Sequence, residues 1–404
     1  MLGIVEGFYG PVWSPLDRVS LIEFASRIDM DIYIYGPKWD PYHRDWWRTP
    51  YDSPGIEALR TFVIACARYG IEPVIALSPG LDIDYSSRDD LNTLVRKLST
   101  FMDLGVRTLA IFLDDIPPRV PRGFSSLAEA QAHLVNYVVK ELSPRRLILC
   151  PTHYYGVKRD YLGVLASRLD GPIEIMWTGP YVCPHRVEER HFMEFTQVVG
   201  RKPFVWENYP VNDFFTCRGI TRLHLGPIKG RPKNLRELVS GYVLNPANQV
   251  ECSKIVLYTA SELYRDGDSY DPEKSLERAV DHVVNKSARY WFKRFIEFNR
   301  ASFLDLKERT VDRGSAQEVL EIVKNLRETL RNKALLREIE RVLDKMEALA
   351  RYLQGERVEL SFRVQTCGEY NPPIPTDKMV NEMFGIEARS LPWFTRLYPE
   401  RAWW

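Results

Sequence analysis

The sequence lacks an excess of charge, a long hydrophobic run and a recognisable leader. Its 404 residues contain 55 Lys and Arg against 54 Asp and Glu, which gives a net charge of +1. Proteins that bind nucleic acids or membrane surfaces usually carry a marked basic excess, so neither partner is expected. No stretch approaches the ~18 apolar residues of a membrane span, and Met1 is not followed by the basic and then apolar segments of a secretory signal. These absences favour a cytoplasmic globular protein.

Cysteines are few and unpaired along the sequence. None of them forms a Cys-x-x-Cys pair or a spacing suited to zinc, and the histidines show no ligand pattern. We therefore expect reduced, mostly buried thiols, no metal and no cofactor. Aromatic residues, in contrast, make up 12% of the chain, and aromatic side chains either pack in a core or line sites for sugars. The cysteines are Cys66, Cys150, Cys183, Cys217, Cys252 and Cys367.

Up to about residue 270, short apolar runs alternate with amphipathic helical patterns. Such βα repeats predict an α/β protein with a (β/α)8 TIM barrel, because strands covered on both faces read as continuous apolar runs. An open, doubly wound sheet is the alternative, but it usually has a glycine-rich phosphate loop after its first strand, which Gly7–Gly10 is not. The expected strands are Leu2–Val5, Ile32–Tyr35, Pro73–Leu77, Arg107–Leu113, Arg146–Cys150, Ile173–Trp177, Pro203–Trp206 and Lys254–Tyr258, and the expected helices between them include Pro15–Ile28, Gly55–Tyr69, Asp90–Leu104, Ser125–Leu142 and Asn234–Leu244.

The pattern changes near Asp271 and Pro272, which suit an N-cap and the first position of a helix. Apolar stripes then predict an α-helical bundle of about three helices. The second helix is expected to start at Ser315, with Glu318 completing a capping box. The tail is rich in Pro and Trp, and we expect it to pack on the body because so many Trp would not stay exposed. The expected domains are a barrel over residues 1–270, a helical domain over 271–360 and the packed tail over 361–404.

Polar residues gather where the predicted strands end, which in a barrel is the end that carries the active site. The fourth strand ends in Asp114 and Asp115. Two adjacent carboxylates after a dry strand repel each other and lose hydration, so we expect one of them to have a raised pKa. Neighbouring side chains of one strand point apart, so the pair suits two acids that handle different atoms of one sugar rather than the usual ~5–9 Å arrangement of glycosidases. Simple capping of the next segment is the alternative.

Motifs follow one another through the predicted barrel: Gly3–Gly10, Tyr35–Lys38 with Asp40–Arg44, Leu77–Asp82, Asp114–Ile116, Trp177–Pro180, Trp206–Asn208 and Leu244–Pro246. In this order they resemble glycoside hydrolase family 84. That family contains the protein O-GlcNAcases and bacterial β-N-acetylglucosaminidases, some of them labelled hyaluronidases. The resemblance extends to about residue 265.

The resemblance implies retaining exo-hydrolysis of terminal β-linked N-acetylglucosamine (GlcNAc), in which the substrate's own acetamido oxygen forms an oxazoline. It implies that Asp114 orients the acetamido N–H and that Asp115 is the general acid and then the base. The implied partner is a GlcNAc-containing glycoside or glycoprotein. The implied substrate-binding residues are Tyr154, near the acetamido group and leaving oxygen; Gly7, Lys38, Asn208, Asp213 and Asn245, around the hydroxyls; and Trp206 and Val182, in the wall.

Departures from the family include Glu207, which replaces a common Asp and is expected at the pocket edge. Two other functions stay open. An endo-acting hyaluronidase-like or chitin-fragment hydrolase would use the same site in an open cleft. An inactive sugar-binding protein would not need both Asp114 and Asp115. The natural aglycone and the oligomeric state are not readable from the sequence.

Overall fold

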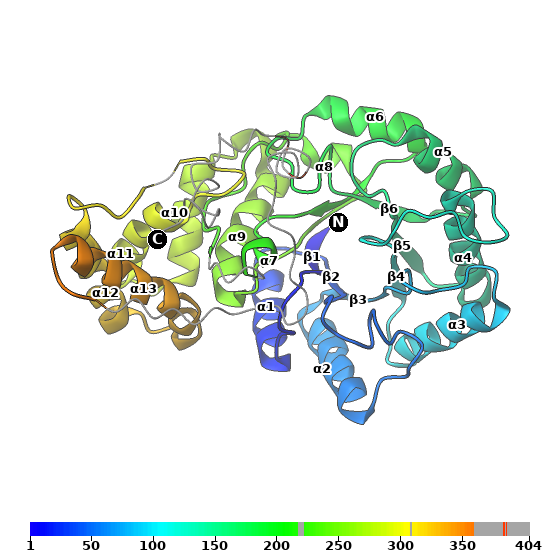
Figure 1. Cartoon of the computed structure of the whole chain (residues 1–404), viewed down its shortest axis with the longest axis horizontal. Coiled ribbons are helices and arrows are strands. Elements are labelled where there is room, and N and C mark those ends of the chain that lie inside the picture. The colour runs from blue at the N-terminus through cyan, green and yellow to red at the C-terminus, as the bar shows by residue number, and fades with distance from the viewer. Residues whose placement is uncertain (217–221, 308, 359–382, 384, 386–404) are drawn as a thin grey trace. The chain divides into compact units, whose positions relative to one another are not determined.

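The first part of the chain closes into a barrel of eight parallel strands, which confirms the expected architecture (Figure 1). The structure is a computed structural model, and it describes residues 1–216, 222–307, 309–358, 383 and 385. Each strand pairs with the next, and β8 pairs with β1, so the barrel has no open edge. The strands are β1 (Leu2–Glu6), β2 (Ile32–Tyr35), β3 (Glu72–Leu77), β4 (Thr108–Phe112), β5 (Arg146–Cys150), β6 (Glu174–Trp177), β7 (Phe204–Glu207) and β8 (Gly241–Leu244).

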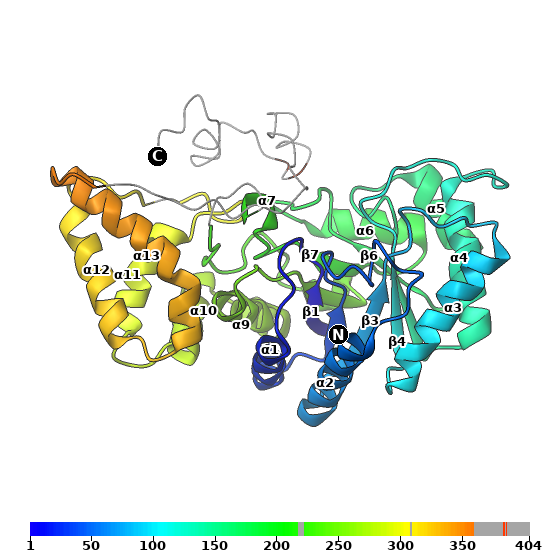
Figure 2. The ribbon, with the colours of Figure 1, turned by 60° about the horizontal axis from the view of Figure 1, so that its bottom comes forward.

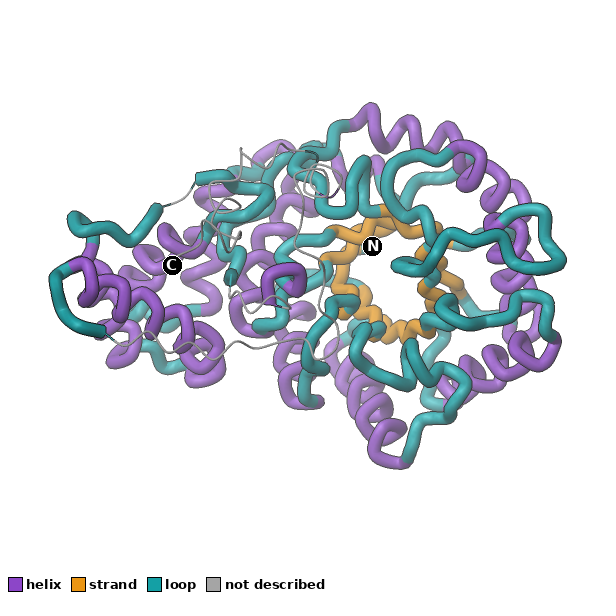
Figure 3. Tube along the Cα trace, in the orientation of Figure 1, coloured by secondary structure: helices purple, strands orange, loops and turns teal. Residues whose placement is uncertain are grey.

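Helices follow the strands and surround the barrel (Figure 3). They begin where the sequence supplies a cap: Ser14, Asp52, Ser87 and Ser126 each accept a hydrogen bond from a backbone N–H in the first turn. Such a cap satisfies a donor that the helix itself leaves unpaired. These helices are α1 (Pro15–Arg27), α2 (Ser53–Tyr69), α3 (Arg88–Asp103), α4 (Leu127–Leu142), α5 (Arg159–Arg168), α6 (Glu189–Val199) and the short α8 (Leu235–Leu238).

One buried cluster fills the barrel with side chains from every strand, among them Val5, Phe112 and Trp206. The rings of Phe112 and Trp206 pack with their centroids 5.1 Å apart. The interior is therefore a packed core and not a channel. A polar site can only be built at the end of the barrel, where the strands stop.

The eighth strand differs from the sequence prediction. β8 lies inside the expected helix Asn234–Leu244, of which only α8 is helical. The expected strand Lys254–Tyr258 lies inside helix α9 (Val250–Asp266). Helix α9 buries most of its residues on all sides, so it has no amphipathic stripe. A short apolar run within such a helix looks the same as a buried strand.

A second compact unit comprises the described residues within Tyr209–Lys233 and Pro246–Trp404, and the first comprises Met1–Asn208 and Asn234–Asn245. The expected domain limits at residues 270 and 360 stay predictions. One buried cluster joins the long helices of the second unit, in which α12 and α13 lie side by side (Figure 2). Its helices are α7 (Asp213–Thr216), α9, the 3-10 turn η1 (Gly267–Ser269), α10 (Pro272–Val283), α11 (Arg289–Asn299), α12 (Ala316–Thr329) and α13 (Lys333–Leu353).

The two predicted caps of the second unit have different outcomes. Asp271 caps α10 as expected, because its side chain accepts two backbone N–H groups of the first turn. The prediction of a capping box at Ser315 is wrong. Ser315 does precede α12, but its hydroxyl binds the carboxylate of Asp312 at 2.9 Å, and Glu318 pairs with two arginines. Charged donors compete better for a carboxylate than one backbone N–H does.

Four cysteines of the described part are free and buried, as expected: Cys66, Cys150, Cys183 and Cys252. Cys217 and Cys367 lie outside the described residues, and so does the predicted tail 361–404 apart from residues 383 and 385. Within the described part of the chain, we find no helix that is both long and apolar enough to cross a bilayer.

Candidate active site

Asp114 follows β4 at the end of the barrel and forms a buried ion pair with Lys38, which follows β2. The Lys38 Nζ lies 2.5 Å from Asp114 Oδ2, and both side chains are at most 7% exposed. The same ammonium lies 5.3 Å from the ring centroid of Phe112 and 5.7 Å from that of Trp206. Ring faces attract a cation, so the top of the barrel core holds Lys38 in place and Lys38 in turn holds Asp114.

The pKa of the Asp114 carboxyl lies below its ordinary value. Burial by itself would raise this pKa, but the charges of Lys38 and Arg44, together with the hydrogen bond from Lys38, lower it. Asp114 is therefore not the member of the pair with the raised pKa that the sequence predicts, and it is a carboxylate at neutral pH. Its other oxygen, Oδ1, is buried and accepts no hydrogen bond from the described residues. A buried acceptor without a donor is costly, so Oδ1 is suited to accept an N–H from a ligand.

Asp115 is the exposed member of the pair and contacts a separate set of side chains. Its φ of +53° lies in the left-handed region, which residues other than glycine seldom adopt. Tyr9 donates to Oδ2 at 3.0 Å and Tyr154 donates to Oδ1 at 2.9 Å. Burial and the nearby Asp115 charge raise the pKa of both phenols, so both remain protonated donors. The two phenols, from the loops after β1 and β5, fix the direction of this carboxylate.

Arg44 holds the backbone of both aspartates. Its Nη2 donates to the carbonyl oxygen of Asp115 at 2.9 Å, and its Nη1 lies 3.2 Å from Ser78 Oγ and 3.5 Å from the Asp114 carbonyl oxygen. The side chain is only 6% exposed. A left-handed residue other than glycine costs roughly 1–2 kcal/mol, and the bond from Arg44 offsets part of that cost.

A network of amides and an indole forms the next part of the site. Asn208 Oδ1 accepts from the Trp206 indole at 2.8 Å and from Asn245 Nδ2 at 3.1 Å, and Asn208 Nδ2 donates to the Val182 carbonyl at 2.9 Å. Asn245 Oδ1 accepts the Gly7 backbone N–H at 3.2 Å. A Cβ at Gly7 would lie 2.2 Å from the Trp206 ring, so only glycine fits. Five predicted residues thus meet in one hydrogen-bonded and packed group.

Two predicted positions, Asp213 and Glu207, belong neither to this group nor to the contacts described for Asp114 and Asp115. Asp213 begins α7 in the second compact unit, where its carboxylate accepts the Phe214 backbone N–H at 2.7 Å; its contact with a sugar stays a prediction. Glu207 does not reach a pocket edge, because it is 2% exposed and accepts from the Tyr242 hydroxyl at 2.9 Å. Side chains alternate along a strand, so Glu207 points to the side opposite Trp206, away from the barrel interior.

Sequence reasoning gave no role to Tyr9 or Arg44, although both lie within the motifs used above. In the sequence, Arg44 is an arginine in an aromatic-rich loop. An arginine in such a loop can equally well form an ordinary surface salt bridge. Neighbouring Arg48 makes that ordinary pairing, with Asp82 and Asp90. Sequence alone cannot tell the two arginines apart.

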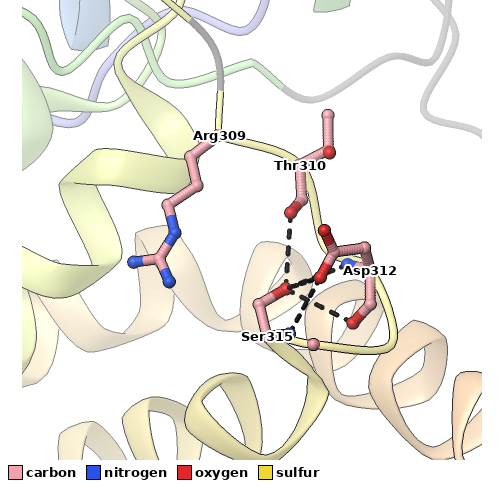
Figure 4. Close-up of a pocket in the computed structure, with 5 residues that line it drawn as sticks. Arg309, Thr310, Asp312 and Ser315 are labelled. Atoms are coloured by element: carbon pink, nitrogen blue, oxygen red, sulfur yellow. Dashed lines mark hydrogen bonds between the residues drawn. The ribbon is translucent and has the colours of Figure 1, made fainter.

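A small pocket of about 410 Å³ lies between α11 and α12 in the second unit (Figure 4). Its polar groups are already engaged, since Asp312 and Ser315 bind each other and Arg309 pairs with two glutamates. It therefore offers no chemistry comparable with the barrel end. Among the described residues, no group of three or more His, Cys, Asp or Glu could hold a metal ion. The pocket is lined by Arg309, Thr310, Asp312, Gly314 and Ser315.

Comparisons with known proteins identify the family of the chain. The model of a family described as beta-N-acetylglucosaminidase matches residues 2–297. The protein O-GlcNAcases of Rattus norvegicus and Mus musculus are each 33% identical over 277 residues, which are 66% of this chain and 30% of theirs. The chain therefore spans less than a third of the length of these curated relatives. A solved structure of a mutant O-GlcNAc hydrolase from Thermobaculum terrenum superposes with a TM-score of 0.78 at 31% identity, over 87% of this chain and 82% of that one. The chain thus belongs to the β-N-acetylglucosaminidases of glycoside hydrolase family 84.

Proposed function

We propose that this chain is a retaining exo-β-N-acetylglucosaminidase that removes terminal β-linked GlcNAc with the help of the substrate's own acetamido group. The observation that carries the proposal is the buried carboxylate of Asp114, whose Oδ1 has no donor among the described residues. An acetamido N–H supplies such a donor. The 2-hydroxyl of a plain glucoside can also donate, but it brings no acyl oxygen to act as the nucleophile. The names of the relatives, O-GlcNAcase and O-GlcNAc hydrolase, support the same sugar.

In the first step the acetamido oxygen attacks the anomeric carbon and the bond to the leaving oxygen breaks. Asp114 accepts the acetamido N–H, and its negative charge stabilises the positive charge that develops on the closing ring. Lys38 and Arg44 keep the pKa of Asp114 low, so the charge is present when the ring closes. Asp115 gives its proton to the leaving oxygen, which departs as an alcohol.

In the second step Asp115 takes a proton from a water molecule that opens the oxazoline at the anomeric carbon. Two displacements at the same carbon give net retention. The hydrogen bonds from Tyr9 and Tyr154 stabilise the carboxylate that acts as base in this step. In the first step Asp115 carries the proton and donates it to the leaving oxygen, while the lone pairs of the carboxyl group still accept from the phenols.

Aryl β-GlcNAc should be hydrolysed efficiently, and the matched aryl β-glucoside should be hydrolysed poorly, because only the first substrate carries its own nucleophile. Initial rates with both chromogenic substrates test this. A thiazoline that mimics the oxazoline should inhibit at much lower concentration than the product GlcNAc, as intermediate mimics do. Equal turnover of the two aryl glycosides would contradict a substrate-assisted reaction.

Arg44→Lys should lower kcat/KM for aryl β-GlcNAc by roughly tenfold to a hundredfold. The compact ammonium lacks the planar fork whose two terminal nitrogens contact the carbonyls of Asp114 and Asp115, and a small displacement of a catalytic group is costly. Arg48→Lys is the matched control: it is the same substitution in the same loop, but its partners Asp82 and Asp90 lie outside the site. Thermal unfolding of both variants separates local displacement from loss of the fold. An equal loss of activity in the two variants would refute a specific role for Arg44.

A further inference from the structure

Among the described loops of the barrel unit, large apolar side chains are exposed only in those that follow a strand; Leu16, Ile64 and Met193 are exposed on helices α1, α2 and α6. Each of the first six loops that follow a strand exposes one, whereas the described loops that lead into the strands from the opposite end expose none. Exposed apolar groups gathered on one face mark a binding surface more often than scattered ones do. The six are Val12, Trp46, Leu81, Val120, Tyr155 and Tyr181.

Three of these loops also carry positive charge. We call residues 115–126, 151–158 and 178–188, which follow β4, β5 and β6, the aglycone rim. The rim exposes four cationic side chains that form no ion pair with any described residue: Arg119, Arg122, Lys158 and Arg186. Apart from Asp115, its one acidic residue is Glu188, which pairs with Arg190 at 2.8 Å. In a chain with a net charge of only +1, this is a local positive surface.

The aglycone rim adjoins the proposed general acid. Asp115 is its first residue, and Tyr154, which binds Asp115, contacts the exposed Tyr155 with ring centroids 5.5 Å apart. Thr178 links the second and third loops, because its N–H donates to the Tyr154 carbonyl at 2.9 Å and its hydroxyl donates to the Tyr181 carbonyl at 2.8 Å. The general acid protonates the leaving oxygen, so the loops around Asp115 are the ones that the aglycone meets.

We propose that the aglycone rim binds an acidic polypeptide, so that the substrate is GlcNAc on a Ser or Thr flanked by Asp and Glu. This rests on the proposed function. Unpaired cations steer carboxylates to the site and raise the rate of productive encounter. The aliphatic Val120 is 60% exposed between Arg119 and Arg122, and it suits a polypeptide with apolar and acidic side chains better than a uronate glycan without aliphatic groups.

Three synthetic glycopeptides of equal length test the proposal. Each carries GlcNAc on a central Ser, flanked by Glu, by Gln or by Lys. The Glu peptide should exceed the Gln peptide by roughly tenfold in kcat/KM at low ionic strength, and the Lys peptide should be the poorest. The differences should largely disappear at about 1 M salt, where the Debye length is only ~3 Å. Equal rates for the three peptides would overturn the proposal. So would faster release of GlcNAc from a hyaluronan oligosaccharide than from the Glu peptide.

Paired substitutions locate the effect. Arg119→Gln with Arg122→Gln, and separately Lys158→Gln with Arg186→Gln, should each reduce the preference for the Glu peptide and leave aryl β-GlcNAc hydrolysis unchanged. Arg145→Gln with Lys202→Gln is the matched control, because it removes the same charge from exposed residues before β5 and β7, at the opposite end of the barrel. If the control variant lost as much of the preference for the Glu peptide as the rim variants do, the assignment of the binding surface to the aglycone rim would be overturned. Aryl β-GlcNAc hydrolysis by the unaltered protein tests the proposed function separately.

Discussion

Asp115→Asn is expected to lose roughly 10²–10⁴-fold in kcat/KM on substrates with poor leaving groups, and much less on those with good ones. An alkoxide needs a proton to depart, whereas an activated phenolate does not. The structure supports this role, because Asp115 is the exposed carboxylate of the pair and two phenols direct it. Measuring kcat/KM across a series of aryl β-GlcNAc substrates of graded phenol acidity gives the slope directly.

A fluorine series on the acetamido group provides the internal control for Asp115→Asn. Fluorine weakens the acetamido oxygen as a nucleophile, so the rate should fall steeply with fluorine number in the unaltered protein. The fall should remain steep in the variant if ring closure still limits the rate. A variant whose rate depends on the leaving group no more than that of the unaltered protein would remove Asp115 from the role of acid.

Asp114→Asn is expected to lose roughly 10²–10³-fold on all leaving groups alike, because the lost charge stabilises ring closure and not departure of the alcohol. An amide also leaves the buried Lys38 without its ionic partner, so thermal unfolding must be measured beside activity. Affinity for the thiazoline should fall in Asp114→Asn and change less in Asp115→Asn. Leaving-group dependence in Asp114→Asn and its absence in Asp115→Asn would show that the two roles are exchanged. A loss below about tenfold in both variants would place the site elsewhere.

The predicted elements show how far local patterns reach. Seven strands lie where continuous apolar runs predicted them within a residue or two, because a buried parallel strand is apolar along its length. The eighth was misplaced because the helix predicted over Asn234–Leu244 included β8, Gly241–Leu244, and the longer apolar run nearby belongs to the buried helix α9. Closure of the barrel between β8 and β1 selects the strand, and no local pattern contains that constraint.

The sequence by itself determined the order of the motifs, the family that they resemble and the position of Asp114 and Asp115 at the end of a strand. It could not determine which way the pKa of Asp114 moves, because burial and the charges of Lys38 and Arg44 act in opposite directions. Lys38 lies 76 positions from Asp114, and Arg44 lies 71 positions from Asp115. Barrel closure brings these residues within hydrogen-bonding distance. Electrostatic effects depend on distances in space, so only the tertiary structure decided them.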